Sequence, residues 1–272
     1  MKKLRCFTAV ALGMLGALTA SAQGTKPETT PAVTGLAHVA YRVADLDREE
    51  AFLQKLGFAR SFALTGKDGK LTETFVKIND RTFFEVYPQT DPKQELGWLH
   101  VCYESDDLAS YVAAISGNTA IRPLSVHKAG AGNLITAFPD PDGRNTEFTQ
   151  SMPGSKHMND AGQHLLPNRI ASAVEGVEFA APDVKASRAF YEAMGMKVTN
   201  AAGGLHVQIT STPAPWIELT PVGSTPKLYL QVASLKAAAA QLKAAGIAAK
   251  KDKKTLTIQD PEGNLLVFTE GK

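Results

Sequence analysis

The alternation of apolar and polar residues predicts a strand, a helix and three more strands between residues 36 and 87. Leu36–Val43 alternates and is rich in residues that favour strands. Asp45 is well suited to cap a helix that continues to about Leu56, where Gly57 ends it. The three later strands are expected at Phe58–Leu64, Thr72–Ile78 and Thr82–Tyr87.

The next segment repeats this order of elements. A strand is expected at Trp98–Glu104, followed by a helix that Asp106 or Asp107 caps and that continues to about Ser116. Gly117 ends this helix, as Gly57 ends the first one. Three strands are then expected at Ile121–His127, Leu134–Phe138 and Asn145–Thr149.

The two units also match residue by residue when the chain is shifted by 62 positions. Gly35-Leu-Ala-His-Val-Ala-Tyr41 returns as Gly97-Trp-Leu-His-Val-Cys-Tyr103. His38 precedes Glu85 by 47 residues, and His100 precedes Glu147 by the same 47 residues. Two histidines and two glutamates at corresponding places in a duplicated unit indicate a divalent metal site between two related halves.

The same order of elements occurs twice more after residue 170. The pattern predicts a further helix at Val184–Met194, capped by Asp183, and another at Leu235–Ala245. The strands are expected near Val177–Ala180, Lys197–Asn200, His206–Thr210, Trp216–Thr220, Lys227–Val232, Thr255–Ile258 and Leu265–Thr269. Four copies of one βαβββ unit predict an α+β fold of two tandem domains, at residues 35–151 and 170–272.

The segment Ser151–Arg169 has no clear period, and we expect residues 152–169 to form a linker between the domains. Its residues His157, Asp160 and His164 have the spacing of one helix face. On a polar linker such side chains are usually solvated, so we do not assign them to a metal site.

The N-terminus has the pattern of a secretory signal peptide at residues 1–22. A basic end precedes an apolar run of 14 residues, Phe7–Ala20, which is too short to cross a bilayer. Ala20-Ser21-Ala22 fits a cleavage site. We therefore expect a secreted or periplasmic protein with no membrane contact after cleavage, and a flexible lead-in at residues 23–34.

Composition and charge exclude some classes of partner. Cleavage after Ala22 would change 29 basic residues to 26, against 27 acidic ones, so the mature chain is close to neutral. This balance does not favour nucleic-acid binding. Cleavage would also remove Cys6 and leave Cys102 without a partner for an internal disulfide.

These residues resemble the vicinal-oxygen-chelate superfamily, which includes glyoxalase I, extradiol dioxygenases and fosfomycin-resistance proteins. The resemblance rests on His38 in Leu36–Val43, Glu85 in Phe83–Tyr87, His100 in Leu99–Val101, and Glu147 after the turn Asp140–Gly143. It implies that each pair of units curls a mixed sheet into a cup, and that these four residues hold one divalent metal there. The N/O ligand set suits Ni, Zn, Co, Mn or Fe.

The resemblance also implies roles for other residues of the cup. Arg42 is on the same strand face as His38 and resembles an arginine that holds a substrate carboxylate in the glyoxalase I branch. Cys102 is on the face of His100 and is a second candidate for substrate binding. Glu147 is the expected catalytic base and Glu85 its counterpart.

The second domain resembles the fold but not the ligand set. At the places of the four ligands it has Gly176, Glu218, Tyr229 and Val267, and one carboxylate cannot hold a catalytic metal. We expect a degenerate domain that supports the first one or shapes the substrate entrance. A complete site needs the first unit beside the second, either within one chain or between the chains of a homodimer.

Three functions remain open on these observations. The first is a glyoxalase-like lyase or isomerase that acts on a small oxygenated molecule through a metal-stabilised enediolate. The second is an Fe(II) extradiol-type dioxygenase, which would use only His38, His100 and Glu147. The third is a non-catalytic protein that binds a small molecule. The first two differ mainly in whether Glu85 binds the metal.

Overall fold

The computed structural model describes residues 33–122, 125–210, 212 and 215–271. The expected signal peptide and all of the lead-in except its last two residues lie outside these ranges. Val33 and Thr34 already belong to the first strand, so this strand begins earlier than expected. Within the described ranges, no helix has the length and apolar character needed to cross a membrane.

The first domain has one mixed sheet of eight strands in the order β2-β3-β4-β1-β5-β8-β7-β6. Each unit pairs its first strand with its last strand in parallel, and the two first strands, β1 and β5, pair antiparallel at the centre. The first two units therefore pair within one chain. The strands and helices of this domain are β1 (Val33–Val43), α1 (Leu46–Lys55), β2 (Ala59–Thr65), β3 (Leu71–Lys77), β4 (Phe83–Pro88), β5 (Gly97–Ser105), α2 (Leu108–Ile115), β6 (His127–Lys128), β7 (Leu134–Pro139) and β8 (Asn145–Gln150).

The second domain repeats this topology, in the order β10-β11-β12-β9-β13-β16-β15-β14. Each of its halves also pairs the first strand with the last in parallel. The expected α+β fold of four βαβββ units is therefore confirmed. Its elements are β9 (Ala173–Ala180), α4 (Val184–Ala193), β10 (Lys197–Ala201), β11 (Gly204–Gln208), β12 (Trp216–Thr220), β13 (Lys227–Val232), α5 (Leu235–Ala244), β14 (Lys250–Lys251), β15 (Thr255–Gln259) and β16 (Leu265–Glu270).

Side-chain caps begin the helices where the sequence predicts them. Asp45 accepts a hydrogen bond from the Arg48 amide at 3.0 Å, and Asp107 accepts one from the Ser110 amide at 3.0 Å. Asp183 caps α4 in the same way. Each cap satisfies an amide that has no partner inside the helix, and such a cap typically contributes about 1 kcal/mol.

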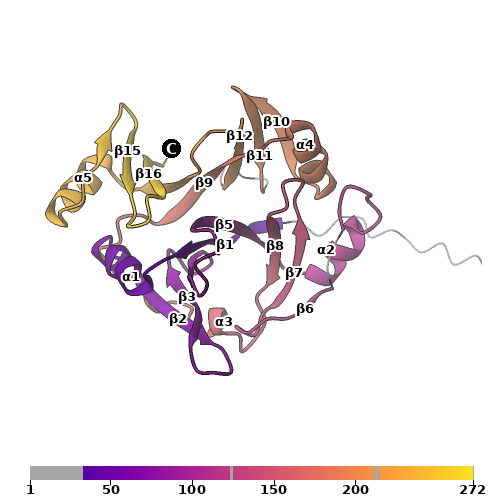
Figure 1. The fold of residues 1–272 in the computed structure, drawn as a ribbon, viewed down its shortest axis with the longest axis horizontal. Helices are drawn as coiled ribbons and strands as arrows, with labels where there is room; N and C mark the ends of the chain where they lie inside the picture. The colour runs from indigo at the N-terminus through magenta and orange to yellow at the C-terminus, as the bar shows by residue number, and fades with distance from the viewer. Residues whose placement is uncertain (1–32, 123–124, 211, 213–214, 272) are drawn as a thin grey trace, which may run out of the picture.

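One hydrophobic core joins the two domains. The sheets stand back to back, with α1 and α5 on one flank and α2 and α4 on the other (Figure 1). Polar contacts cross the boundary on both flanks: the Tyr111 hydroxyl donates to the Met194 carbonyl at 2.9 Å, and Glu262 accepts from the Ala44 amide at 3.0 Å. The concave face of each sheet therefore points away from the other domain.

One predicted strand of the first domain is wrong in its described part. Of the described residues of Ile121–His127, only His127 belongs to a strand, β6, which pairs with β7 at two positions on the sheet edge. Residues 123 and 124 of this prediction lie outside the described ranges.

The segment predicted as a linker contains a short helix, α3 (Lys156–Asn159), which lies at the open side of the first cup (Figure 1).

Candidate metal centre

The four predicted ligands come from the four central strands of the first sheet. His38 is on β1, Glu85 on β4, His100 on β5 and Glu147 on β8, and these strands are neighbours in the order β4-β1-β5-β8. The register pairs Ala40 with both Glu85 and His100. Since alternate residues of a strand share a face, the duplicated spacing brings all four side chains to one point.

The ligand atoms converge closely. One nitrogen or oxygen from each residue lies within 4.8 Å of the others. Glu85 Oε2 is 3.0 Å from His38 Nε2 and 3.3 Å from His100 Nε2. Glu147 Oε2 is 3.3 Å from His100 Nε2 and 3.6 Å from His38 Nε2, and the two Nε2 atoms are 3.3 Å apart.

This arrangement fits a divalent cation. Ligands about 2.1 Å from a metal and at right angles to each other would lie about 3.0 Å apart, which is close to the separations found. Glu85 Oε2 is fully buried and makes no hydrogen bond to a described residue, although two imidazole nitrogens face it. A buried carboxylate oxygen without a partner is costly, and a shared cation would satisfy it.

The charges of the cluster also suit a cation. Burial alone would raise the pKa of Glu85, but the nearby charges of His38 and His100 hold it well below its usual value. Burial also opposes ionisation of Glu147, and hydrogen bonds from His100 and His38 lower its pKa to about 2. Both carboxylates are therefore ionised and together balance a 2+ charge.

Of the two predicted substrate-binding residues, Cys102 lies beside His38, and Arg42 lies four residues farther along β1. Arg42 donates from Nη1 to the Glu95 carbonyl at 3.1 Å, while its buried Nε makes no hydrogen bond to a described residue. Cys102 is the register partner of His38 and is fully buried, and burial raises the pKa of its thiol to about 11. Cys102 therefore packs beside His38 as a neutral thiol.

Sequence reasoning missed three further polar groups of this cup. Glu73 on β3 and Tyr87 on β4 are near the ligands, and burial followed by repulsion from Glu85 raises the pKa of each. His157, on α3, comes from the segment that we expected to be solvated. Strand alternation from Phe75 and Glu85 could have indicated Glu73 and Tyr87, but no pattern in the sequence marks His157.

His157 is held by aromatic rings. Its imidazole makes edge contacts with Phe62, Phe75 and Phe83, at centroid distances of 4.9, 5.2 and 5.0 Å. Phe75 also contacts the ring of His38. Burial and the nearby charge of His38 lower the pKa of His157 to about 4, so this imidazole is neutral near pH 7.

The second cup has no comparable ligand set among its described residues. Gly176 corresponds to His38, and the Trp216 ring fills the space beside it, since a Cβ on Gly176 would come within 2.2 Å of that ring. Val267 corresponds to Glu147. The expectation that the second domain lacks the ligand set therefore agrees with the structure.

The prediction that Tyr229 corresponds to His100 is wrong. Tyr229 pairs with Gly176 as Cys102 pairs with His38, so Tyr229 corresponds to Cys102. The position of His100 is instead occupied by Lys227, two residues earlier.

One family model matches the first domain. The model of the Glyoxalase/Bleomycin resistance protein/Dioxygenase superfamily matches residues 35–148. No curated protein matches the sequence significantly.

Solved structures resemble nearly the whole chain. The Mn(II)-bound glyoxalase from Novosphingobium aromaticivorans has a TM-score of 0.68 and 17% identity, over 88% of this chain and 83% of that one. A catechol 2,3-dioxygenase has a TM-score of 0.66 and 14% identity, over 89% of both chains. Homoprotocatechuate 2,3-dioxygenase from Arthrobacter globiformis has a TM-score of 0.64 and 14% identity, over 89% of this chain and 81% of that one. At these identities the likeness establishes the two-domain fold.

Proposed function

Because the model of the Glyoxalase/Bleomycin resistance protein/Dioxygenase superfamily matches residues 35–148, we propose that the protein is a metal-dependent lyase or isomerase of glyoxalase type. One observation carries the proposal: Glu85 Oε2 lies within 3.3 Å of both His38 Nε2 and His100 Nε2. A set of two histidines and one glutamate would leave this carboxylate outside the cluster. Its position supports a four-residue site.

In this proposal His38, Glu85, His100 and Glu147 hold one divalent metal ion. The solved glyoxalase with a similar fold contains Mn(II), which is one of the ions that this ligand set suits. When bound, the ion supplies a Lewis acid for two adjacent oxygens of a small substrate. The walls of the cup exclude water from the reacting carbons, since the four side chains are buried or nearly so.

Glu147 is the residue that moves the proton. Its side chain is 15% exposed, against 6% for Glu85, and its contact with His38 is longer, at 3.6 Å against 3.0 Å. Glu147 is therefore the less constrained carboxylate and the one that a substrate can reach. It would take a proton from one carbon and return it to the next, while Glu85 remains fixed.

Metal content and proton exchange test this function. We expect about one Ni, Zn, Co or Mn ion per purified chain, and none in His100→Ala. We also expect the wild type to incorporate solvent deuterium into hydroxyketones and hemithioacetals, which NMR detects. The variant Glu147→Gln should lose this incorporation while it retains some metal. A chain that takes up no metal on titration would overturn the proposal and leave a binding protein.

An Fe(II) dioxygenase is the second candidate, because the two-domain fold is shared with a catechol 2,3-dioxygenase over 89% of both chains. It predicts bound iron, consumption of O₂ with catechol, and an activity that Glu85→Gln leaves largely unchanged. The same preparations measured with an oxygen electrode distinguish the two candidates.

We also propose that the protein acts outside the cytoplasm. The support is the signal-like pattern of residues 1–22 in the sequence. N-terminal sequencing of the protein from cell fractions tests this: a mature chain that begins at Gln23 supports export, and an intact Met1 in the cytoplasmic fraction contradicts it.

A further inference from the structure

The segment that connects the domains closes one side of the first cup. A cavity of about 370 Å³ lies between this segment and the sheet. His38 lines it from β1, and His157 and Met158 line it from α3. A molecule that reaches the metal centre past His38 therefore passes the α3 segment.

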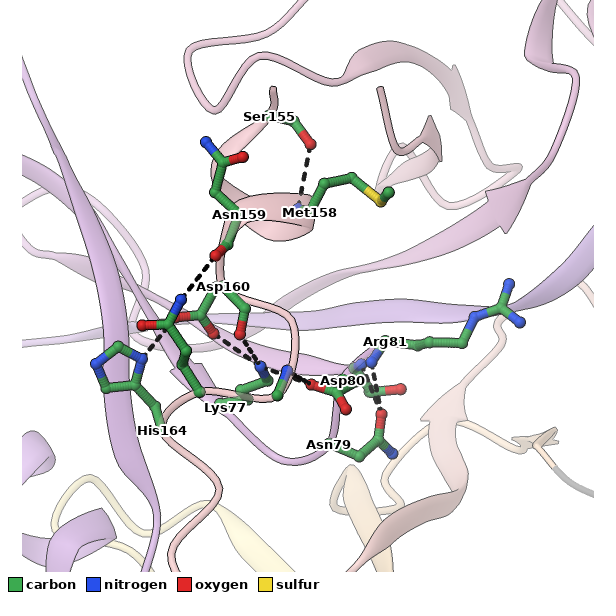
Figure 2. A network of polar contacts seen from close by, with 12 residues as sticks. Lys77, Asn79, Asp80, Arg81, Ser155, Met158, Asn159, Asp160 and His164 are labelled. Atoms are coloured by element: carbon green, nitrogen blue, oxygen red, sulfur yellow. Dashed lines mark hydrogen bonds and ion pairs between the residues drawn. The ribbon is translucent and has the colours of Figure 1, made fainter. Parts of the chain in front are cut away.

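A buried ion pair holds this segment against the sheet (Figure 2). Lys77 on β3 is fully buried, and its Nζ donates to Asp160 Oδ2 at 2.8 Å and to the Asp160 carbonyl at 2.6 Å. Asp80 Oδ1 accepts from the same Nζ at 2.8 Å and from the Gly162 amide at 2.8 Å. The far side of Asp160 contacts His164, with Oδ1 2.5 Å from Nδ1.

The other end of α3 is also fixed. The Lys156 amide donates to the Ala131 carbonyl at 2.8 Å, and the Ser155 hydroxyl accepts from the Met158 amide at 3.3 Å. His157 thus lies between two anchored points only a few residues apart. Such support gives a side chain one orientation before any ligand arrives, which a flexible linker would not do.

The polar atoms of His157 are not used by the protein itself. Its ring contacts three phenylalanines, and Nδ1 is fully buried without a hydrogen bond to a described residue. Burying a polar nitrogen without a partner destabilises the folded protein. A phenylalanine would fill the same aromatic surroundings without this cost, so packing alone does not explain a histidine.

The size and lining of the cavity indicate what it accommodates. A dry cavity of about 150 Å³ is enough for benzene, so the space here suits a substituted single ring. Phe83, Met158 and Ala37 supply apolar wall, and the polar wall includes His157, Asn133 and Thr149. Charged side chains also line the cavity: Asp80, Arg81, Glu104 and Asp106. This lining suits a small molecule that carries polar groups of its own.

We propose that His157 is a specificity-determining residue that hydrogen-bonds a polar group of the substrate other than its two adjacent oxygens, and that the substrate is about the size of a substituted single ring. The inference rests on the proposed function, since the adjacent oxygens lie at the metal centre. The part of the substrate that carries the polar group occupies the cavity between His38 and α3. The segment between the domains then belongs to the active site.

Two chelating probes separate this role from metal binding. Both carry two adjacent oxygens on a single ring, but 4-hydroxybenzohydroxamate has a ring hydroxyl that can hydrogen-bond an imidazole, and benzohydroxamate has none. Their affinities are measured by calorimetry for the Zn(II)-loaded wild type, His157→Phe and His157→Gln. We expect His157→Phe to weaken 4-hydroxybenzohydroxamate about tenfold, the effect of one lost hydrogen bond. Benzohydroxamate should change by less than about twofold, and His157→Gln should keep most of the affinity for 4-hydroxybenzohydroxamate.

The matched control is His127→Phe. His127 is an exposed histidine on β6 and does not line the cavity, so the same exchange there should change neither affinity. Zinc content and melting temperature are recorded for every variant. Equal 4-hydroxybenzohydroxamate affinity in wild type and His157→Phe, at equal zinc content, would overturn the proposal.

A second measurement does not depend on metal. Histidines of the wild type are labelled with ¹⁵N, and the ring signals are followed as 4-hydroxybenzohydroxamate is added to Zn(II)-loaded and metal-free protein. The proposal expects the His157 signals to shift, identified by their absence in His157→Gln. If no form binds zinc, the proposed function fails. A shift in the metal-free protein would then retain the role of His157 in ligand binding, and unchanged signals would remove it.

Discussion

Lys227 Nζ lies 2.6 Å from Glu178 Oε1, at the place in the second sheet that corresponds to His100 in the first. Glu178 is the register partner of Lys227, as Ala40 is of His100. A protonated lysine has no lone pair to offer a metal, and it brings its own positive charge. The second cup therefore balances its buried carboxylate with an ammonium group, where the first cup has the ligand set for a cation.

This difference predicts that each chain binds one metal ion, in the first domain only. His100→Ala should remove the ion, whereas Lys227→Ala should leave the metal content unchanged. Elemental mass spectrometry of both variants, prepared side by side, measures this. Two ions per wild-type chain, or loss of metal in Lys227→Ala, would show that the second cup binds metal after all.

The buried pair between Lys77 and Asp160 predicts a large effect on stability. Lys77→Met leaves Asp160 buried without its ammonium partner, and breaking such a pair typically costs about 3–5 kcal/mol. Urea unfolding measures the change, and the double variant Lys77→Met, Asp160→Asn should recover part of it.

The control is a similar pair on the surface. Lys70 and Asp68 lie 3.8 Å apart with exposed side chains, so Lys70→Met should change the free energy of unfolding by less than about 0.5 kcal/mol. Equal effects of the two lysine substitutions would mean that the contact with Asp160 does not stabilise the fold.

Local signals made much of this fold predictable. Asp45, Asp107 and Asp183 cap helices because a short acidic side chain suits the exposed amides of a first turn, whatever surrounds it. The convergence of His38 and Glu85 with their counterparts was predictable for another reason. In a duplicated unit, the same spacing between a histidine and a glutamate places both residues at the same points of the fold. The repeated spacing in the sequence therefore predicted the symmetric site.

Long-range contacts explain what the sequence did not reveal. His157 lies in the cup because Lys77, 83 residues before Asp160, anchors the segment, and no local period reports such a pair. The mismatch of Tyr229 with His100 has a similar origin. Pairing between the central strands shifts register at irregular positions, and a shift changes which residue reaches a given place.

The two glutamates of the centre should differ when each is changed to glutamine. Glu85 is closer to His38 than Glu147 is, equally close to His100, and less exposed. Glu85→Gln should therefore lower the metal affinity more than Glu147→Gln does, by at least about 100-fold. Glu147→Gln should keep more metal but lose proton exchange. Zinc titration with a competing chelator and deuterium incorporation measure the two effects. Equal loss of metal in both variants would contradict the assignment of Glu147 as the mobile base.

A buried carboxylate between the domains predicts a stability that falls as pH rises. Burial, and then repulsion from Asp260 across the domain boundary, raises the pKa of Glu49 to about 8, although the Tyr41 hydroxyl donates to its Oε1 at 2.8 Å. Glu262 adds a further negative charge and Arg48 a weaker positive one. The folded state thus holds a proton that the unfolded chain loses near pH 4.5.

The sign of the effect follows from this proton. Its stabilisation is complete below pH 4.5 and is lost progressively up to about pH 8, with an upper bound on the order of 5 kcal/mol. Glu49→Gln resembles the protonated side chain, so it should be more stable than wild type at pH 9 and similar near pH 4.5. Urea unfolding across this range measures both, with Asp47→Asn as an exposed control on the same helix. If the difference in stability between the wild type and Glu49→Gln stayed constant from pH 4.5 to pH 9, Glu49 would already be ionised in the folded protein.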